Sequence, residues 1–185
     1  MSPAPRLTGI RAFGLVWIGQ LVSLLGSNMT TFGLTIWAFE QTGRATELAL
    51  LSVFYIVPQL VMSPLAGMLV DRVDRKRMMM VSDFGAGLVT IGLWLLLSTG
   101  RLEIGYLYLS TALQSAFQSF QWPAYSAAIA AMLPKEHYTR ANSLMGLGGP
   151  SSQIFAPLLA GALLAVIGLR GIMLIDIVTF LVDKK

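Results

Sequence analysis

The sequence contains no cysteine and a single histidine, His137. The lack of cysteine excludes disulfide bonds, thiol chemistry and a cysteine-ligated metal site. One histidine excludes a multi-histidine metal site within the chain. Charge is also scarce, because 12% of the 185 residues are charged, whereas a soluble domain carries about 25%. Charge this sparse cannot coat a surface that faces water, so the composition predicts an integral membrane protein.

The sequence also lacks the motifs of the common enzyme classes. It has no Ser/His/Asp set at workable spacing, no phosphate-binding P-loop and no zinc-ligand cluster. We therefore expect no enzyme activity, no cofactor, no bound metal and no ATP-driven step of its own. The formal net charge is +4, but the basic residues flank apolar runs. They are better explained as signals of membrane topology than as a nucleic-acid surface.

Long apolar runs dominate the chain, and the mean hydropathy is +0.70. A membrane span needs roughly 20 apolar residues, and the first run is too long for the core of a signal peptide. The fold class predicted is all-α, a polytopic transmembrane bundle of about six helices with the last one incomplete. The spans are expected near residues 13–39, 48–70, 78–97, 104–133, 141–168 and 172–182. Five prolines lie inside these spans and predict either packing kinks or hinges.

Lysine and arginine are distributed unevenly between the two sides that these spans define. Of the thirteen, ten fall on one side, in the N-terminus, the loops near residues 72–77 and 135–140, and the C-terminus. Arg44, Arg101 and Arg170 fall on the other side. Because cytoplasmic loops carry an excess of Lys and Arg, the N-terminus is predicted to be cytoplasmic.

Polar residues inside the spans recur at helical spacing. The first predicted helix carries one such face, and the fourth carries another that is rich in glutamine. The residues are Gln20, Ser23, Ser27 and Thr31, then Gln114, Gln118, Gln121, Trp122 and Tyr125. An unpaired amide in lipid costs several kcal/mol, so each face should line a cavity or form hydrogen bonds between helices. For a third face, Ser52, Tyr55, Gln59 and Ser63 on the second helix, packing is favoured.

Small residues repeat every fourth position in the fifth predicted helix. The set is Gly148, Ser152, Ala156 and Ala160, with Pro157 and Gly161 alongside. Small side chains let two helix backbones approach closely, so this stripe predicts helix packing, with a role in gating as the alternative.

Two acidic residues, Asp83 and Asp176, lie within predicted spans. An intramembrane carboxylate is a candidate for proton coupling. An ion pair with residues 75–77 is favoured for Asp83 and a structural hydrogen bond for Asp176, with proton coupling as the alternative for each.

Six of the seven residues from Asp71 to Arg77 are charged. This segment cannot lie in lipid and predicts a tight turn at the membrane surface. The pattern Gly67-x-x-x-Asp71-Arg72-x-Asp74-Arg75-Lys76-Arg77 resembles the signature of the major facilitator superfamily, in which glycine often stands at the place of Asp74. Residues 19–27, 37–43, 117–124, 140–143 and 175–180 resemble its branch of drug, macrolide and siderophore exporters.

The resemblance implies that residues 1–185 form the N-terminal six-helix half of a twelve-span secondary transporter. It implies proton-coupled efflux of hydrophobic or amphipathic small molecules, with the first and fourth helices lining the cavity. The charged turn would brace one conformational state, with Gly67 allowing close helix approach and Asp71 meeting a helix end of the second half. The Ala156-Pro157-x-x-Ala160-Gly161 segment is similar to an antiporter motif in which two glycines are replaced by alanine.

The length of the chain leaves its form open. It could be a fragment or truncated reading frame, a half-transporter that pairs with a second chain, or part of a normal transporter. The expected partners are the lipid membrane, a small-molecule substrate, and a C-terminal half or second subunit. The alternative function is a non-transporting membrane component that pairs with another membrane subunit through the fifth-helix stripe.

Overall fold

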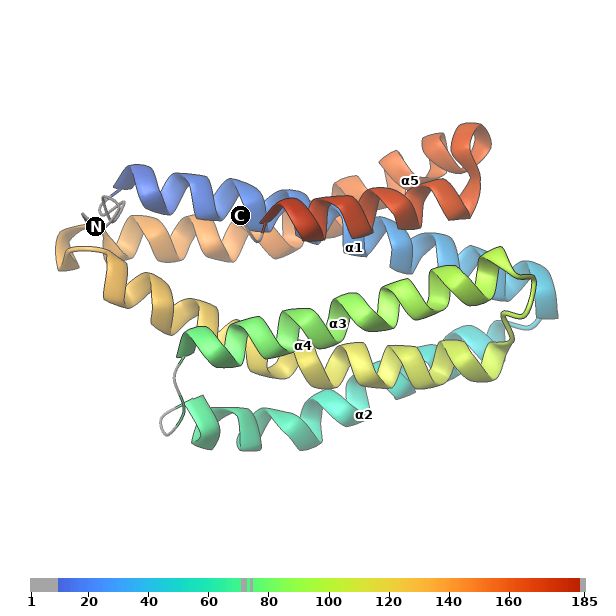
Figure 1. The fold of residues 1–185 in the computed structure, drawn as a ribbon, viewed down its shortest axis with the longest axis horizontal. Helices are drawn as coiled ribbons and strands as arrows, with labels where there is room; N and C mark the ends of the chain where they lie inside the picture. The colour runs from blue at the N-terminus through green and yellow to red at the C-terminus, as the bar shows by residue number, and fades with distance from the viewer. Residues whose placement is uncertain (1–9, 71–72, 74, 184–185) are drawn as a thin grey trace, which may run out of the picture.

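The protein is described by a computed structural model covering residues 10–70, 73 and 75–183 (Figure 1). Within these residues the structure contains helices and no strand. The helices are α1 (Ile10–Thr42), α2 (Ala45–Val70), α3 (Arg75–Ser98), α4 (Ile104–Met132), the short 3-10 helix η1 (Lys135–His137) and α5 (Tyr138–Asp183). The predicted all-α bundle is therefore confirmed.

The helix α5 folds back on itself at Gly168. This residue has a φ of 65° and a ψ of 178° inside the helix, a conformation that glycine adopts readily because it lacks a Cβ atom. Residues 138–167 and 169–183 therefore form two antiparallel segments (Figure 1). The fifth and sixth predicted spans correspond to these two segments, and the other four predicted spans correspond to α1 to α4.

Three helices are long and apolar enough to cross a membrane by length and composition alone. Within the described residues they are Ala45–Leu69, Met80–Ser98 and Tyr138–Leu181. The two other long helices, α1 and α4, carry the predicted polar faces, which lower their mean hydropathy. Large apolar side chains on the outside of the bundle, such as Leu60, Leu158 and Val166, are 67–79% exposed. Such a surface suits contact with lipid.

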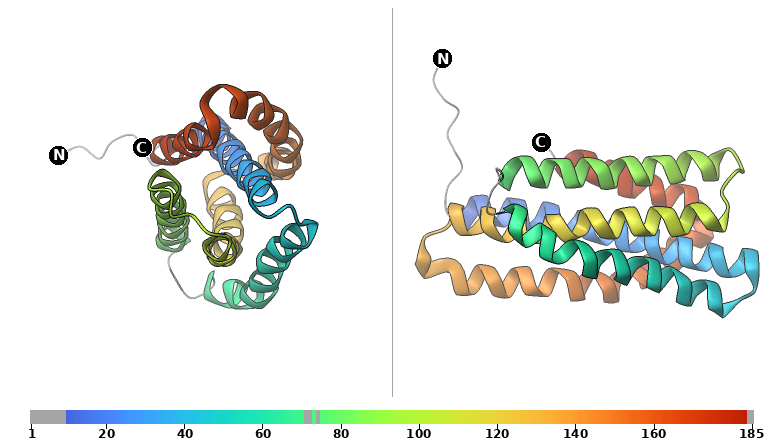
Figure 2. Two further views of the ribbon diagram at one scale, coloured as in Figure 1. Left: turned by 90° about the vertical axis from the view of Figure 1, so that its right-hand side faces the viewer. Right: turned by 90° about the horizontal axis from the view of Figure 1, so that it is seen from below.

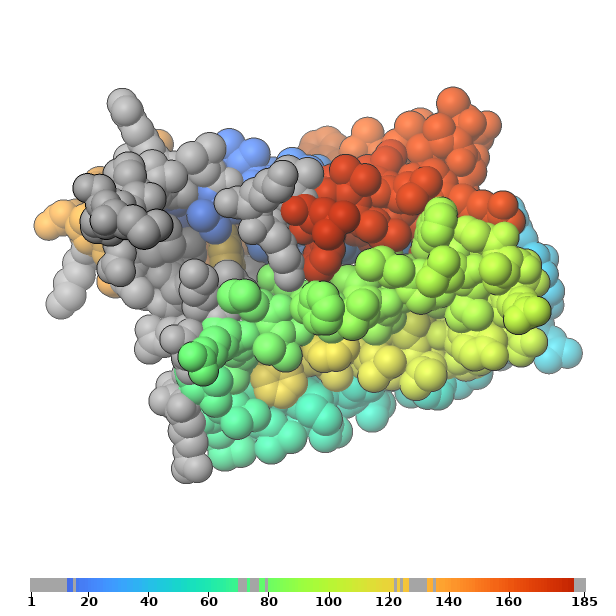
Figure 3. Space-filling view, viewed as in Figure 1, coloured from blue at the N-terminus to red at the C-terminus, as the bar shows by residue number. Residues whose placement is uncertain are grey.

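The helices form two packed groups, α1 with α5 and α2 with α3 and α4, which meet chiefly where α3 contacts α5. The helix α1 packs mainly against α5, whereas α4 packs between α2 and α3 (Figures 1 and 2). On the face seen in Figure 3, α3 lies beside the second segment of α5.

Three apolar clusters hold the bundle at different heights. Phe13 and Tyr125 are buried near the start of α1, Met29 and Ala156 near its middle, and Ala38 near its end.

The stripe of small residues on α5 faces α1 over most of its length. Ser152, Ala156 and Ala160 are fully buried, and the Asn28 side chain donates a 2.8 Å hydrogen bond to the Ser152 hydroxyl. A Cβ atom added to Gly148 would lie 3.9 Å from the Trp17 ring nitrogen.

The last two members of the stripe lie differently. Pro157 is half-buried, and Gly161 is exposed on the outside of the bundle. The stripe therefore packs within the chain and does not extend to Gly161.

Most of the charged turn lies outside the described residues, namely Asp71, Arg72 and Asp74. Arg75, Lys76 and Arg77 occupy the first turn of α3; of these three side chains only that of Arg77 is described, and it is exposed. Gly67 is also exposed, and an added Cβ atom would meet no described atom within 4 Å. The close approach expected at Gly67 is thus not made inside the described part of the bundle, and the role of the turn stays a prediction.

The contact between α1 and α5 can be tested by enlarging Ala156. Overpacking a fully buried position costs about 1–3 kcal/mol, so Ala156→Leu should lower the unfolding free energy by that amount. Ala162→Leu is the matched control, because Ala162 is exposed on the same helix and should change stability by less than about 0.5 kcal/mol. Denaturation in detergent, followed by circular dichroism, measures both. Equal effects of the two variants would contradict the assigned packing.

Candidate functional site

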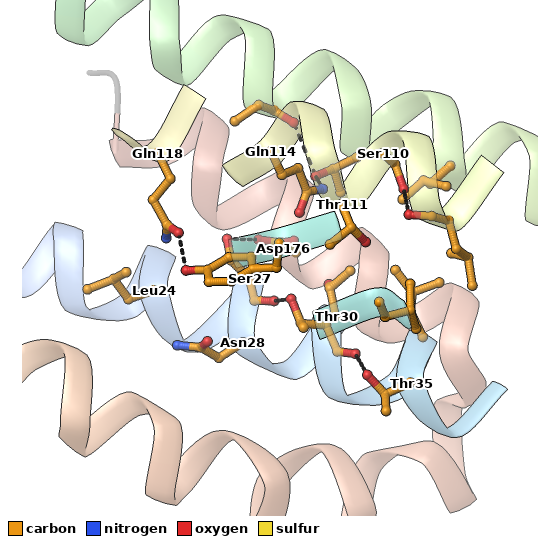
Figure 4. Close-up of a pocket in the computed structure, with 18 of the residues that line it drawn as sticks. Leu24, Ser27, Asn28, Thr30, Thr35, Ser110, Thr111, Gln114, Gln118 and Asp176 are labelled. Atoms are coloured by element: carbon orange, nitrogen blue, oxygen red, sulfur yellow. Dashed lines mark hydrogen bonds between the residues drawn. The ribbon is translucent and has the colours of Figure 1, made fainter. Parts of the chain in front are cut away.

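A cavity of about 670 Å³ lies between α1, α2, α3, α4 and α5, whose second segment contributes more of the lining than the first (Figure 4). Its apolar lining comes from leucine, isoleucine, alanine, glycine and phenylalanine side chains. The polar lining is larger than the sequence predicted. It consists of Gln20, Ser23, Ser27, Asn28, Thr30, Thr31, Thr35, Ser52, Tyr55, Thr90, Ser110, Thr111, Gln114, Gln118, Gln121, Gln153 and Asp176.

The predicted polar face of the first helix lies entirely on this cavity. Gln20, Ser23, Ser27 and Thr31 all line it from α1. The Thr31 hydroxyl donates to the carbonyl oxygen of Ser27 at 2.9 Å, so its hydrogen is used within its own helix. Such bonds allow hydroxyl groups to sit in a membrane helix without an unpaired donor.

The three glutamines of α4 line the opposite wall, and each is bound to a neighbouring helix. Gln114 donates through its side-chain nitrogen to the Thr90 hydroxyl oxygen at 3.4 Å. Gln118 accepts a 2.6 Å hydrogen bond from the Tyr55 hydroxyl. Gln121 donates to Oδ1 of Asp83 at 2.6 Å. The sequence left two interpretations of the glutamine face open, namely cavity lining and hydrogen bonding between helices. In the structure the three glutamines do both.

Tyr125 does not lie on the cavity, contrary to the expectation for the α4 face. It is 5% exposed and packs in an apolar cluster with Phe13 and Met145. The reason is that α1, α4 and the start of α5 converge at this end of the bundle, so the ring fills the space between them. The side chain of Trp122 lies outside the described part of the structure.

The polar face of α2 divides between two environments. Ser52 and Tyr55 line the cavity, although packing was the favoured interpretation of this face. Gln59 and Ser63 lie further along α2, outside the lining. Tyr55 also makes a packing contact, because the Ser115 hydroxyl on α4 donates to its carbonyl oxygen.

Asp176 lies in the cavity wall, behind Ser27. Its side chain is 4% exposed, and its Oδ1 accepts a 2.9 Å hydrogen bond from the Ser27 hydroxyl. The backbones approach closely here: a Cβ atom added to the neighbouring Gly26 would lie 3.2 Å from the Asp176 Cα and 2.9 Å from the Thr179 hydroxyl oxygen. Among the described lining residues, Asp176 alone is an Asp, Glu, Lys or Arg. The cavity therefore has one ionisable carboxyl in an otherwise neutral wall.

Asp83 is set apart from the cavity lining and contacts it through Gln121. It is half-buried on α3. Its expected ionic partners were residues 75–77, of which the side chains of Arg75 and Lys76 lie outside the described part of the structure, so the ion pair stays a prediction. The observed contact shows that Asp83 holds an amide of the cavity wall.

Several lining residues were missed in the sequence analysis, although helical spacing could have identified three of them. Ser110 and Thr111 precede Gln114 by four and three positions, so they continue the same helical face of α4. Thr35 extends the α1 face in the same way. Thr90 is a single polar residue in an apolar stretch of α3, and Gln153 follows two serines on α5; no periodic pattern identifies either as a lining residue.

The arrangement favours binding over bond-breaking chemistry. It offers amides, hydroxyls and one carboxyl across an open volume, and the carboxyl is held by a hydroxyl of the same wall. Within the described residues no group of three His, Asp or Glu side chains could hold a metal ion.

Comparison with known proteins matches residues 16–182 to the Major Facilitator Superfamily. The chain is 30% identical over 158 residues to the uncharacterized MFS-type transporter YfiS of Bacillus subtilis, covering 85% of this chain and 37% of that protein. It is 28% identical over 170 residues to macrolide efflux protein A of Streptococcus pyogenes, covering 89% of this chain and 41% of that protein.

The fold is also similar to that of a solved structure. A bacterial homologue of the iron transporter ferroportin, in an outward-facing state, aligns with a TM-score of 0.71 and 20% sequence identity. The alignment covers 94% of this chain and 48% of that one. The chain thus spans less than half the length of the relatives it matches. The match over residues 16–182 shows that the chain belongs to the major facilitator superfamily of membrane transporters.

Proposed function

We propose that this chain forms the substrate-binding half of a transporter that exports hydrophobic or amphipathic small molecules. The observation that carries the proposal is a cavity of about 670 Å³, lined by polar side chains, inside an otherwise apolar bundle. Polar groups in a membrane helix are costly unless they have a task or a partner. A cavity with apolar walls and a few oriented polar groups suits an amphipathic ligand.

The similarity to macrolide efflux protein A supports export as the direction of transport. A bulky, mostly apolar compound with scattered polar groups would match a wall of leucines, glutamines and hydroxyls. The likeness to the ferroportin homologue supports the shared fold only, because the two sequences are 20% identical.

Transport in this account requires a second six-helix unit, either in the same polypeptide or as a separate subunit. Alternating access moves one half against the other around a site near the middle of the membrane. The charged turn after Gly67 would contact that second unit. We place the protein in a bacterial plasma membrane with its N-terminus in the cytoplasm. The side opposite the N-terminus carries few Lys or Arg residues, namely Arg44, Arg101 and Arg170, as expected for the outer side of the membrane.

The alternative of a non-transporting component that pairs through the α5 stripe has less support. Ala156 and Ala160 are fully buried in the cluster that contains Met29 of α1. A surface already covered by α1 is not free to bind another subunit.

We further propose Asp176 as the residue that couples transport to protons. A carboxyl at the cavity wall that is bound only by neutral hydroxyl groups is stabilised by protonation or by a cation. Asp176 meets this condition, because Ser27 is its hydrogen-bond donor. Proton release and substrate movement would then share one site.

The binding site can be tested with the purified chain in lipid nanodiscs. We expect saturable one-to-one binding of erythromycin, a hydroxylated macrolide, and of tetraphenylphosphonium, an apolar cation, by isothermal titration calorimetry. Thr31→Trp fills the cavity and should weaken both at least tenfold. Thr139→Trp, an exposed position at the start of α5, is the matched control and should leave both unchanged. If neither compound shows saturable binding to the wild-type chain, the proposed function is overturned.

The coupling role predicts a pH dependence that belongs to Asp176. Protonation removes the charge of the carboxyl, so tetraphenylphosphonium should bind more weakly as the pH is lowered. Asp176→Asn should bind this cation at least tenfold more weakly and without pH dependence, since an amide does not titrate. Glu136→Gln, an exposed acid-to-amide control, should keep the wild-type pH profile. If Asp176→Asn binds tetraphenylphosphonium with the same pH dependence as the wild type, the coupling role is ruled out.

A further inference from the structure

We propose that Gln114, Gln118 and Gln121 form an oriented row of hydrogen-bonding groups that selects substrates rich in hydroxyl groups over bare apolar cations. The proposal rests on the proposed function of this cavity as a substrate site. It adds a preference for hydroxyl-rich ligands that is argued from the orientation of the three amides. Its basis is that each amide is held by a neighbouring helix, which decides which of its two polar atoms is left for a ligand.

The orientation of Gln121 follows from its partner. A carboxylate is an acceptor only, so the Asp83 oxygen at 2.6 Å must receive a hydrogen from the Gln121 amide nitrogen. The Gln121 oxygen then has no partner among the described residues and belongs to the cavity lining. Gln121 therefore presents an acceptor to a ligand, and Asp83 is its positioning residue.

The orientation of Gln114 follows from a chain of two hydrogen bonds. The Thr90 hydroxyl donates its one hydrogen to the carbonyl oxygen of Ala86 at 3.3 Å. Its oxygen can then only accept, and it does so from the Gln114 nitrogen at 3.4 Å. Gln114 is left with its oxygen toward the cavity, which makes it a second acceptor.

Gln118 has the opposite orientation. Its oxygen accepts from the Tyr55 hydroxyl at 2.6 Å, and Tyr55 is fixed to the same helix by the Ser115 hydroxyl. The amide nitrogen of Gln118 remains for the cavity, and the side chain is exposed to it (Figure 4). A ligand passing along α4 thus meets an acceptor, a donor and an acceptor. The rise of about 1.5 Å per residue separates them by about 6 Å and about 4.5 Å.

The facing wall reinforces the excess of acceptors. The Thr31 and Thr35 hydroxyls on α1 donate within their own helix, at 2.9 Å and 2.8 Å. Ser27 donates to Asp176. Each of these hydroxyls keeps only acceptor capacity for a ligand. A cavity dominated by acceptors is complementary to a ligand that supplies donors, such as an amphipathic molecule bearing several hydroxyl groups.

Two probes separate this selectivity from general binding. Erythromycin carries hydroxyl and carbonyl groups, whereas tetraphenylphosphonium has no hydrogen-bonding group. In nanodiscs, Gln121→Leu should weaken erythromycin binding about tenfold, as expected for one lost hydrogen bond, and leave tetraphenylphosphonium within about twofold. Gln59→Leu is the matched control, since Gln59 lies on α2 outside the lining, and should change neither.

A reciprocal exchange tests the positioning role of Asp83. Gln121→Glu alone sets two carboxyl groups against each other and should weaken erythromycin binding at least tenfold. Adding Asp83→Asn restores a donor–acceptor pair with reversed polarity, and the second oxygen of the new Glu side chain still faces the cavity as an acceptor. The double variant should bind erythromycin within about threefold of wild type, a non-additive result that marks a direct coupling.

Four outcomes would overturn the inference. If Gln121→Leu weakens the binding of both probes equally, the glutamine only supports the fold. Failure of Asp83→Asn to rescue Gln121→Glu, with both proteins folded by circular dichroism, would remove the positioning role. Failure of wild type to bind either probe would remove the proposed function itself, and the inference with it. Binding of both probes with unchanged selectivity in every variant would contradict the oriented row alone.

Discussion

The structure depends on one constraint, which is that a polar atom inside a membrane bundle needs a hydrogen-bond partner. The contact between Ser27 and Asp176 meets this constraint where α1 and the second segment of α5 lie close together. Gly26 favours that approach, because an added Cβ atom would lie 2.9 Å from the Thr179 hydroxyl oxygen and 3.2 Å from the Asp176 Cα. The same contact places a carboxyl at the wall of the cavity. Ser27 and Asp176 therefore both join the two helices and supply the carboxyl of the cavity wall.

The same constraint gives the opposite wall its character. Each glutamine of α4 uses one end of its amide to bind α2 or α3, so the other end is directed to the cavity. The bonds that hold the helices together thus also orient the groups that a ligand would meet. This links stability to specificity: a change in Asp83, which lies outside the cavity lining, would alter recognition without touching the ligand.

Periodic features were predictable from the sequence, and features that depend on helix contacts were not. The spacing of Gln114, Gln118 and Gln121 placed them on one face, and the apolar runs gave the helices. No periodicity could show that Asp176 meets Ser27, because that contact depends on the fold-back at Gly168. Tyr125 shares the spacing of the glutamines but lies where three helices converge, so its ring is buried in a core cluster. The charged turn identified the family although most of it lies outside the described residues.

The most direct test of the account is photoaffinity labelling of the chain in lipid nanodiscs with a photoreactive macrolide, followed by mass spectrometry of the labelled peptides. The account predicts labels on the cavity faces of α1, α2 and α4, around Thr31, Ser52 and Gln118, which excess unlabelled macrolide removes. Labels confined to outward-facing positions such as Leu60 and Leu158, and insensitive to competition, would contradict it.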